Sequence, residues 1–471
     1  MVLTPSERLD GPIAHKCGVF AIYGHPEAVH LARYALLALQ HRGQEAAGIA
    51  ASDGRDLRVA RGMGLVTEAL GGARLDPLLE MGATSAIGHV RYSTAGASSF
   101  ANAQPLMLAC RQGKVAIAHN GNLTNTAALR QRLAPAALET DADTELILHL
   151  IGRSRADGLG EALMEALGQV EGAYALAVQG AYRIWLCRDP NGIRPLVLGT
   201  LGSAWVAASE SCALDAIGAS VQREVAPGEV MELGPGGPRT IGQLTAPAAS
   251  GVCLFEYVYL ARPDSEIGGR NVHLARKDMG RRLWQQAPVP ADVVVGVPDT
   301  GVSAAVGFAE ASGIPYELGL IKNRYVGRTF IQPSQALREA GVRLKLNAVT
   351  AVLEGRSVVL VEDSIVRGTT ARRLVDLVRG VGAREVHLRI ASPPFVHPCY
   401  YGIDIPRRAD LLAPGLTLAQ MAGAVGADSL AFLSLDAARE AAGGGSFCAA
   451  CFTGCYPVES SDALARAGAG G

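Results

Sequence analysis

The chain has 471 residues, a length that predicts two or three domains rather than a single core. Its 43 basic and 44 acidic side chains leave a formal net charge of −1, which argues against a nucleic-acid partner because phosphates favour a strongly basic surface. No apolar run approaches the roughly 18 residues of a membrane span, and the leader MVLTPSERLDGPIAHK lacks the apolar core of a secretory signal, so we expect a cytoplasmic protein without a membrane partner.

Short strands dominate the first half of the chain, from Cys17 to about residue 250. Apolar or alternating segments of this half are separated by Gly-rich turns, and helical patterns interrupt them near 26–39, 143–151 and 160–167. Because strands outnumber helices, we predict an α+β domain with stacked antiparallel sheets over 17–250. The expected strands are CGVFAIYG, AAGIAAS, AIGHVRYST, VAIAHNGNL, YALAVQG, RIWLCRD and WVAASES.

Strands and helices alternate in the second half, residues 251–471. This alternation with short loops predicts right-handed βαβ units and a parallel sheet, hence an α/β domain that ends in a cysteine-bearing tail. Ligands of such sheets bind beyond the carboxyl ends of the strands. The expected strands are ADVVVGV, PYELGLI, RSVVLVED and EVHLRIA, and the expected helices are VSAAVGFAEAS, ended by Gly313, and ARRLVDLVRGVG.

The segment VVLVEDSIVRGTT, residues 358–370, ends a strand in two carboxylates and a hydroxyl-rich turn. Hydroxyls and backbone N–H groups from Ser364 to Thr370 can surround a phosphate, and the N-terminus of the next helix favours negative charge. Glu362 and Asp363 would repel that phosphate unless they bind Mg²⁺ or sugar hydroxyls. The alternative is a solvated turn at a strand end.

Two further segments add to a polyanion site. The strand VVVGV is followed by a second anion-binding loop around Asp299–Gly301. The stretch GLIKNRYVGRTFIQPS carries Lys322, Arg324 and Arg328, which predicts a lid that closes over a polyanion. A solvated basic surface is the alternative for this stretch.

The segment VVLVEDSIVRGTT resembles the fingerprint of type I phosphoribosyltransferases, which bind 5-phosphoribosyl-1-diphosphate (PRPP). The resemblance implies that the acidic pair binds the ribose hydroxyls, that the following loop holds the 5-phosphate, and that PDTG takes the diphosphate. Members usually carry aspartate where this chain has Glu362, whose side chain is one methylene longer. The implied PRPP-binding residues are Asp299, Thr300, Gly301, Lys322, Arg324, Glu362, Asp363, Ser364, Arg367, Gly368, Thr369 and Thr370, and the implied Mg²⁺ ligands are Thr300, Glu362 and Asp363.

Cys17 starts a predicted strand after the polar leader. A buried strand-edge cysteine is one interpretation of this position. The functional interpretation requires cleavage between Lys16 and Cys17, so that residues 1–16 are a removed propeptide. The freed α-amino group, with an ordinary pKa of about 7.7–8.0, can then act as the general base for its own thiol.

Four motifs after Cys17 resemble class II glutamine amidotransferases, whose nucleophile is an N-terminal cysteine. They are LQHRGQEAAGIA, GHVRYSTAG, AHNGNLTN and DADTE, in that family's order. The resemblance implies that Cys17 attacks the side-chain amide of glutamine and that Asn120 with the N–H of Gly121 forms the oxyanion hole. Taken alone, the Asn–Gly pair in HNG reads as a hairpin turn, and a lone arginine as an ion-pair residue. The implied glutamine-binding residues are Arg91, Tyr92, Thr94 and Asp143.

Nine cysteines are spread along the chain, and four of them could form one thiolate site. The tail carries the C-x-x-C pair Cys448 and Cys451, while Cys253 and Cys399 lie far from it in sequence. Four thiolates suit either Zn²⁺ or an iron–sulfur cluster, and spacing does not choose between them. Unpaired structural cysteines are the third interpretation.

All these motifs together resemble the amidophosphoribosyltransferase family, in its branch with a cleaved leader and a 4Fe–4S cluster on Cys253, Cys399, Cys448 and Cys451. The resemblance implies the first committed step of purine biosynthesis: glutamine, PRPP and water give 5-phosphoribosylamine, glutamate and diphosphate. Ammonia made in the first half would attack C1 of PRPP in the second through a closed passage. The family also implies Mg²⁺, a homotetramer, and feedback inhibition by purine nucleotides that contact Lys322 and Lys345; Cys455 is a possible substitute cluster ligand.

Two alternatives share parts of this pattern. A glutamine-dependent sugar-phosphate aminotransferase would have the first half but needs sugar-isomerase motifs in the second. A PRPP-sensing regulator would lack the Cys17 motifs and carry a DNA-binding module, and the sequence contains no such motif.

Overall fold

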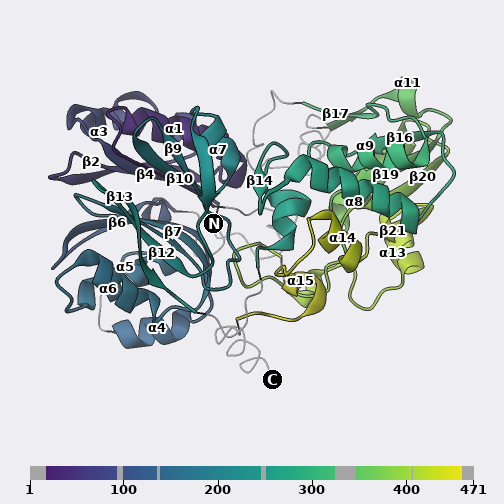
Figure 1. The fold of residues 1–471 in the computed structure, drawn as a ribbon. Helices are drawn as coiled ribbons and strands as arrows, with labels where there is room; N and C mark the ends of the chain where they lie inside the picture. The colour runs from purple at the N-terminus through teal and green to yellow at the C-terminus, as the bar shows by residue number, and fades with distance from the viewer. Residues whose placement is uncertain are drawn as a thin grey trace, which may run out of the picture.

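The computed structural model describes residues 17–92, 99–134, 138–245, 251–323, 346–405 and 407–458. These residues form two halves that lie side by side, with strands and helices layered in each (Figure 1). The predicted propeptide, Thr94, Arg324, Arg328 and Lys345 fall outside the described residues.

The first half contains two stacked antiparallel sheets, as the sequence predicts. The seven-stranded sheet has the order β11-β9-β10-β1-β4-β2-β3 and the six-stranded sheet the order β13-β12-β8-β7-β6-β5. The strands are β1 (Gly18–Tyr23), β2 (Ala46–Ser52), β3 (Leu57–Met63), β4 (Ser85–Arg91), β5 (Leu106–Cys110), β6 (Gly113–Leu123), β7 (Gly172–Gln179), β8 (Ile184–Arg188), β9 (Val197–Leu201), β10 (Ala204–Ala208), β11 (Ser220–Glu224), β12 (Glu229–Gly234) and β13 (Gly237–Gln243).

Helices cover the outer faces of both sheets, which gives four layers (Figure 1). Phe20 and Ile22 of β1 pack towards α1, whereas Val19 and Ala21 pack between the sheets, so both faces of this strand are buried. The helices on the seven-stranded sheet are α1 (Ala28–Ala38), α2 (Val66–Ala69), α3 (Asp76–Glu80) and α7 (Ser211–Asp215), and those on the six-stranded sheet are α4 (Thr126–Leu133), α5 (Asp143–Arg153) and α6 (Leu159–Leu167). Short 3₁₀ turns occupy η2 (Gln40–Arg42), η3 (Gly72–Arg74) and η4 (Phe100–Asn102).

The second half is built on a parallel sheet with the order β16-β19-β20-β21, which confirms the predicted α/β class. Its strands are β16 (Val293–Gly296), β19 (Ser357–Glu362), β20 (Glu385–Ile390) and β21 (Ser429–Phe432). Helices α8 (Val272–Gln286), α9 (Gly301–Ser312) and α14 (Leu435–Ala441) cover one face, and α11 (Thr350–Leu353), α12 (Thr369–Gly380) and α13 (Leu418–Val425) cover the other. Smaller elements are η5 (Glu256–Leu260), β14 (Glu266–Ile267), β15 (Arg270–Asn271), η6 (Arg408–Asp410) and α15 (Ala450–Thr453).

One predicted strand, PYELGLI, is wrong as a continuous strand of this sheet. Tyr316 forms only an isolated bridge to Val294, and the chain then enters β17 (Leu320–Lys322), which pairs antiparallel with β18 (Leu346–Ala348). Gly319 lies against the sheet here, because a Cβ at this position would lie 2.7 Å from a methyl group of Val295. Gly319 thus lies over the side chain of Val295 rather than continuing the pairing with β16.

Helix α9 illustrates how the sequence sets an element boundary. Gly313 ends the helix at φ +73°, the left-handed conformation that glycine adopts without a Cβ penalty, as predicted.

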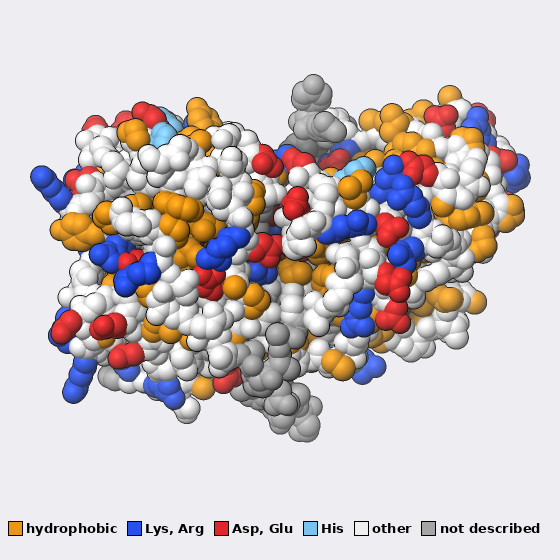
Figure 2. All heavy atoms as spheres, viewed as in Figure 1, with side chains coloured by type: hydrophobic (Ala, Val, Ile, Leu, Met, Phe, Trp, Pro, Cys, Tyr) orange, Lys and Arg blue, Asp and Glu red, His pale blue; other side chains and the backbone are white. Residues whose placement is uncertain are grey.

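None of the helices in the described ranges is both long and apolar enough to cross a membrane. Charged side chains of both signs are interspersed over the face that Figure 2 shows, in keeping with a net charge near zero.

Candidate functional site

Cys17 lies where β1 begins, beside the end of the neighbouring strand β4. The antiparallel register pairs Gly18 with Val90, so the chain brings Cys17 to Arg91 and Tyr92. The Cys17 thiol donates to the Tyr92 carbonyl over 3.6 Å and is buried. Burial raises the pKa of the Cys17 thiol, while the Tyr92 contact and the nearby Arg91 guanidinium lower it. A buried thiol of raised pKa needs a local base to become a nucleophile.

Asn120 and Gly121 lie on β6, next to the start of β1. Ser209 joins the two, because its hydroxyl accepts from the Val19 N–H at 2.9 Å and from the Asn120 amide at 3.3 Å. Gly121 has φ +151°, and a Cβ there would lie 1.9 Å from the Ala173 carbonyl oxygen, so only glycine fits. Sequence reasoning missed Ser209, which follows β10 and carries no motif of its own.

Asp143 and Arg91, the predicted partners of the glutamine α-groups, are both buried polar residues of this region. Burial opposes ionisation of Asp143, but His119 and the Leu123 N–H, which donates over 2.8 Å, outweigh it and hold the pKa of Asp143 below its usual value. An ionised carboxylate is the form that an ammonium group requires. Arg91 extends towards Glu45, with an N–O distance of 3.7 Å.

The two predicted anion loops meet at one edge of the parallel sheet. Strands β16 and β19 are neighbours, and the Thr300 hydroxyl of the first loop donates to the Asp363 carboxylate of the second. Ser364 donates to the other oxygen of Asp363 over 2.5 Å. A Cβ on Gly301 would lie 2.6 Å from the Val361 carbonyl oxygen, which explains a glycine at the start of α9.

Helix α12 begins in the second loop, after Gly368 at φ +83°. Thr369 and Thr370 form its exposed first turn, and Arg367 lies just before it, so the loop leads directly into a helix N-terminus, which favours negative charge. Lys322 is paired with Asp299 over 2.5 Å, which places β17 beside the first loop. The structure thus brings together every described residue of the predicted PRPP set.

The acidic pair has an unusual electrostatic environment. Burial, and then the charge of Asp363, raise the pKa of Glu362 well above its usual value. Burial also raises the pKa of Asp363, although Ser364, Thr300 and the Arg276 guanidinium oppose the shift. Two adjacent buried carboxylates do not both ionise readily without a partner, so this pair is suited to bind a cation or sugar hydroxyls.

Tyr259 lies on the π-helical turn η5 at the start of the second half. Burial, and then the charges of Asp363 and Glu362, raise the pKa of its phenol, and Tyr92 of the first half adds to the effect. Tyr259 also stacks on Phe255, with ring centroids 5.4 Å apart. The pKa of this phenol therefore responds to charged groups of both halves of the chain.

The four cysteines of the predicted thiolate site come together at the junction of the halves. Leu254 donates to the Cys448 carbonyl over 3.0 Å, and the Cys451 carbonyl accepts from Val396 and His397 over 3.1 Å. Burial, and then the charges of the other three thiols, raise the pKa of Cys451. Among the described residues no group of three or more His, Cys, Asp or Glu side chains is arranged to hold a metal ion, and Cys455 is exposed.

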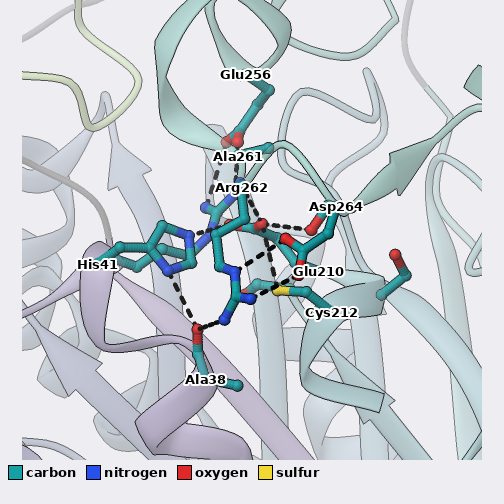
Figure 3. Close-up of polar contacts among 12 residues, drawn as sticks. Ala38, His41, Glu210, Cys212, Glu256, Ala261, Arg262 and Asp264 are labelled. Atoms are coloured by element: carbon teal, nitrogen blue, oxygen red, sulfur yellow. Dashed lines mark hydrogen bonds and ion pairs between the residues drawn. The ribbon is translucent and has the colours of Figure 1, made fainter. Parts of the chain in front are cut away.

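A buried ion network also joins the halves, and sequence reasoning missed it. Arg42 donates to Glu210 of the first half and, over 2.5 Å, to Glu256 of the second. Glu210 accepts in addition from His41 at 2.7 Å and from the Arg262 N–H at 2.8 Å, as Figure 3 shows. Charged residues in HRGQE and ASES gave no signal of burial, because each has its partner far away in the sequence.

Glu210→Gln is expected to lower the free energy of unfolding by about 3–5 kcal/mol at pH 7, because it breaks a buried ion pair by removing one partner. Burial disfavours the charge of Glu210, but Arg42 and His41 outweigh it and hold its pKa well below the usual value. The carboxylate therefore stabilises the fold above its unfolded pKa of about 4.3, and the contribution is lost as the pH falls towards the folded value. Denaturant unfolding measures the free energy of unfolding at pH 7 and pH 4. The decrease between these pH values should be smaller in the variant than in wild type, and equal decreases would contradict the role of Glu210.

Comparisons with known proteins agree with the predicted classes of the two halves. Residues 89–216 match a glutamine amidotransferase domain and residues 278–391 a phosphoribosyl transferase domain. The chain is 49% identical to the amidophosphoribosyltransferase of Bacillus subtilis over 94% of each chain, and 46% identical to that of Synechococcus elongatus over 98% of this chain and 94% of that one.

Two solved structures are similar over the same length. One is described as the allosteric regulatory enzyme of purine biosynthesis (TM-score 0.89, 49% identity, 94% of this chain and 97% of that one). The other is glutamine PRPP amidotransferase from B. subtilis complexed with ADP and GMP (TM-score 0.88, 48% identity, 94% of this chain and 98% of that one). The match of the second half to a phosphoribosyl transferase domain leaves no support for a sugar-isomerase half.

Proposed function

Since this chain belongs to the amidophosphoribosyltransferase family, we propose that it transfers the amide nitrogen of glutamine to C1 of PRPP, the first committed step of purine biosynthesis. Residues 17–250 are the glutaminase domain and residues 251–471 the phosphoribosyltransferase domain of this proposal. The observation that carries it is the burial of Cys17 within 3.6 Å of the Tyr92 carbonyl, beside Arg91.

The glutaminase half-reaction begins with Cys17 as the N-terminal residue. Its α-amino group takes the thiol proton, Sγ attacks the side-chain carbonyl carbon of glutamine, and the proton passes to the departing ammonia. Asn120 and the Gly121 N–H stabilise the oxyanion of the tetrahedral intermediate. Water then hydrolyses the glutamyl thioester, which releases glutamate and restores the thiol. Arg91, Tyr92, Thr94 and Asp143 hold the glutamine α-groups.

The transferase half-reaction takes place at the carboxyl edge of the parallel sheet. Ammonia attacks C1 of PRPP and displaces diphosphate, while the loop 364–370 holds the 5-phosphate and the loop 299–301 the diphosphate. Lys322 and Arg324 add positive charge from the lid segment. We infer a closed passage for ammonia between the two sites, since free ammonia would be protonated or lost in bulk water.

Mg²⁺ fits the oxygen atoms at this edge. Thr300 and Asp363 already lie within hydrogen-bond reach of one another, and the raised pKa of Glu362 indicates a place where a cation would relieve two crowded carboxylates. Magnesium bound by Thr300, Glu362 and Asp363 would neutralise charge on the diphosphate.

A 4Fe–4S cluster on Cys253, Cys399, Cys448 and Cys451 also fits the donor set. A four-iron cluster has one iron for each thiolate, so its ligands need not converge on a single ion. Burial, and then the charges of neighbouring cysteines, raise the pKa values of Cys253 and Cys451, and an isolated β-bridge joins Cys253 to Cys448. We propose a structural role, since these residues tie the tail to the body of the chain.

Regulation and assembly follow the family. The B. subtilis structure that contains ADP and GMP supports feedback by purine nucleotides, for which Lys322 and Lys345 are the proposed contacts. We also propose a homotetramer in the cytoplasm.

Mass spectrometry of the purified, active protein tests the nucleophile assignment. We expect an N-terminus at Cys17, together with glutamine hydrolysis that rises when PRPP is added. Full activity with Met1 to Lys16 still attached would contradict the proposal, because an internal peptide nitrogen cannot serve as the base.

A further inference from the structure

The segment Cys399–Gly402 of the second half packs directly behind the strand that carries Asn120 and Gly121. The Asn122 side chain donates to the Tyr400 carbonyl over 2.9 Å. A Cβ built on Gly402 would lie 2.9 Å from the backbone carbon and oxygen of Gly121. The two backbones, 281 positions apart in the sequence (402 minus 121), are therefore in van der Waals contact with no side chain between them.

The same segment is held firmly on its other side. Arg194 donates through Nε to the Tyr401 carbonyl over 3.1 Å and binds Glu256 over 3.2 Å. The Tyr401 hydroxyl donates to the Val458 carbonyl over 2.6 Å, and the Tyr401 N–H donates to the Cys399 sulfur over 3.4 Å. These bonds fix Tyr400 and Tyr401, the residues just before Gly402, and so restrict the position of Gly402 against Gly121.

Gly121 has two close backbone neighbours. A Cβ at Gly121 would lie 1.9 Å from the Ala173 oxygen, and Gly402 lies against the Gly121 carbonyl. An oxyanion hole works because its donors point at the developing charge before the reaction starts. The Gly121 carbonyl that Gly402 contacts and the Gly121 N–H that serves as donor share one Cα, so a shift of Gly121 caused by this contact would move the donor away from the oxyanion.

We propose that the Tyr400–Gly402 segment is a positioning element for the oxyanion hole, so that the phosphoribosyltransferase half sets the geometry of the glutaminase half. The inference rests on the proposed role of Asn120 and Gly121. In this proposal Asn122 and Gly402 affect the rate of amide hydrolysis. They do not affect glutamine binding, the reactivity of the thiol or the use of free ammonia.

Gly402→Ala tests the proposal, because its methyl group would push against the Gly121 carbonyl. We expect kcat for glutamine hydrolysis to fall at least 10-fold, since loss of one oxyanion donor costs about 10²–10³-fold. The KM for glutamine, the rate of Cys17 alkylation by iodoacetamide and the ammonia-dependent synthesis should stay within about twofold of wild type.

Gly415→Ala is the matched control. Gly415 also has a positive φ, +82°, but a Cβ there would meet no atom within 4 Å, so this variant carries the backbone strain without the contact. Its kcat should equal that of wild type. Asn122→Ala removes only the bond to Tyr400 and the local bond to Leu123, and it gives a second test, with a several-fold fall in kcat, if Gly402→Ala does not fold.

An unchanged kcat for glutamine hydrolysis in the tested variants would overturn the proposal. So would a fall in ammonia-dependent synthesis equal to the fall in glutamine hydrolysis, because it would indicate general unfolding. A wild-type protein that hydrolyses no glutamine would refute the proposed function instead, so the two failures are distinguishable.

Discussion

Cys17→Ala is expected to abolish glutamine-dependent synthesis of 5-phosphoribosylamine while ammonia-dependent synthesis continues at the wild-type rate. Sγ of Cys17 is the protein atom that forms a bond to glutamine in the proposed mechanism, so its loss removes the acyl transfer completely. The transferase edge lies on a different sheet and keeps its geometry. Both rates are measured by diphosphate release, with either glutamine or ammonium chloride as nitrogen donor.

Cys187→Ala is a useful control for this experiment, because Cys187 is a buried thiol of the same half that packs between the six-stranded sheet and its helices and has no proposed role in catalysis. It should keep both activities if the fold survives. If Cys17→Ala lost ammonia-dependent synthesis as well, Cys17 would be a folding residue and the nucleophile assignment would be wrong.

Asp363→Asn is expected to reduce synthesis by more than about 10²-fold with either nitrogen donor, because charged hydrogen bonds and metal contacts at the reacting centre are both weakened. Asp363 is 5% exposed and accepts from Thr300 and Ser364, so the amide keeps the shape of the site but not its charge. PRPP-independent hydrolysis of glutamine should be unaffected. Initial rates at varied PRPP separate binding from turnover.

Asp376→Asn on the exposed side of α12 is the matched control. Its carboxylate is solvent-exposed and pairs with Arg372 over 3.9 Å, an interaction worth less than about 1 kcal/mol. We expect wild-type synthesis from this variant. If Asp363→Asn instead synthesised product at the wild-type rate, the assignment of the acidic pair to the PRPP site would be wrong.

The sequence predicts the layers of both halves because their strands are apolar over the right length. Strands β1 and β7 are buried on both faces, and their continuous apolar runs give a clear signal. Strand β21 was missed, since SLAF is short and only partly buried. The segment PYELGLI was predicted as one strand from its apolar residues, but only Tyr316 bridges to β16, and the residues from Leu320 pair with the distant β18, which no local pattern reports.

The site was predictable where one loop carries several of its residues. The segments 299–301 and 362–370 are contiguous and follow predicted strands, so their meeting at the sheet edge follows from parallel topology. The contacts between the halves were not predictable. Asn122 meets Tyr400, and Arg42 meets Glu256, through pairings of residues more than 200 positions apart that no local pattern reports.

Transfer of labelled nitrogen tests most directly whether the two halves act as one enzyme. The protein is supplied with PRPP and glutamine labelled with ¹⁵N in its side-chain amide, in the presence of unlabelled ammonium, and the isotope content of the amine product is measured by mass spectrometry. If Cys17 supplies the ammonia and a closed passage carries it to C1 of PRPP, the product should carry ¹⁵N almost exclusively. A product whose nitrogen follows the composition of the surrounding solution would contradict this account.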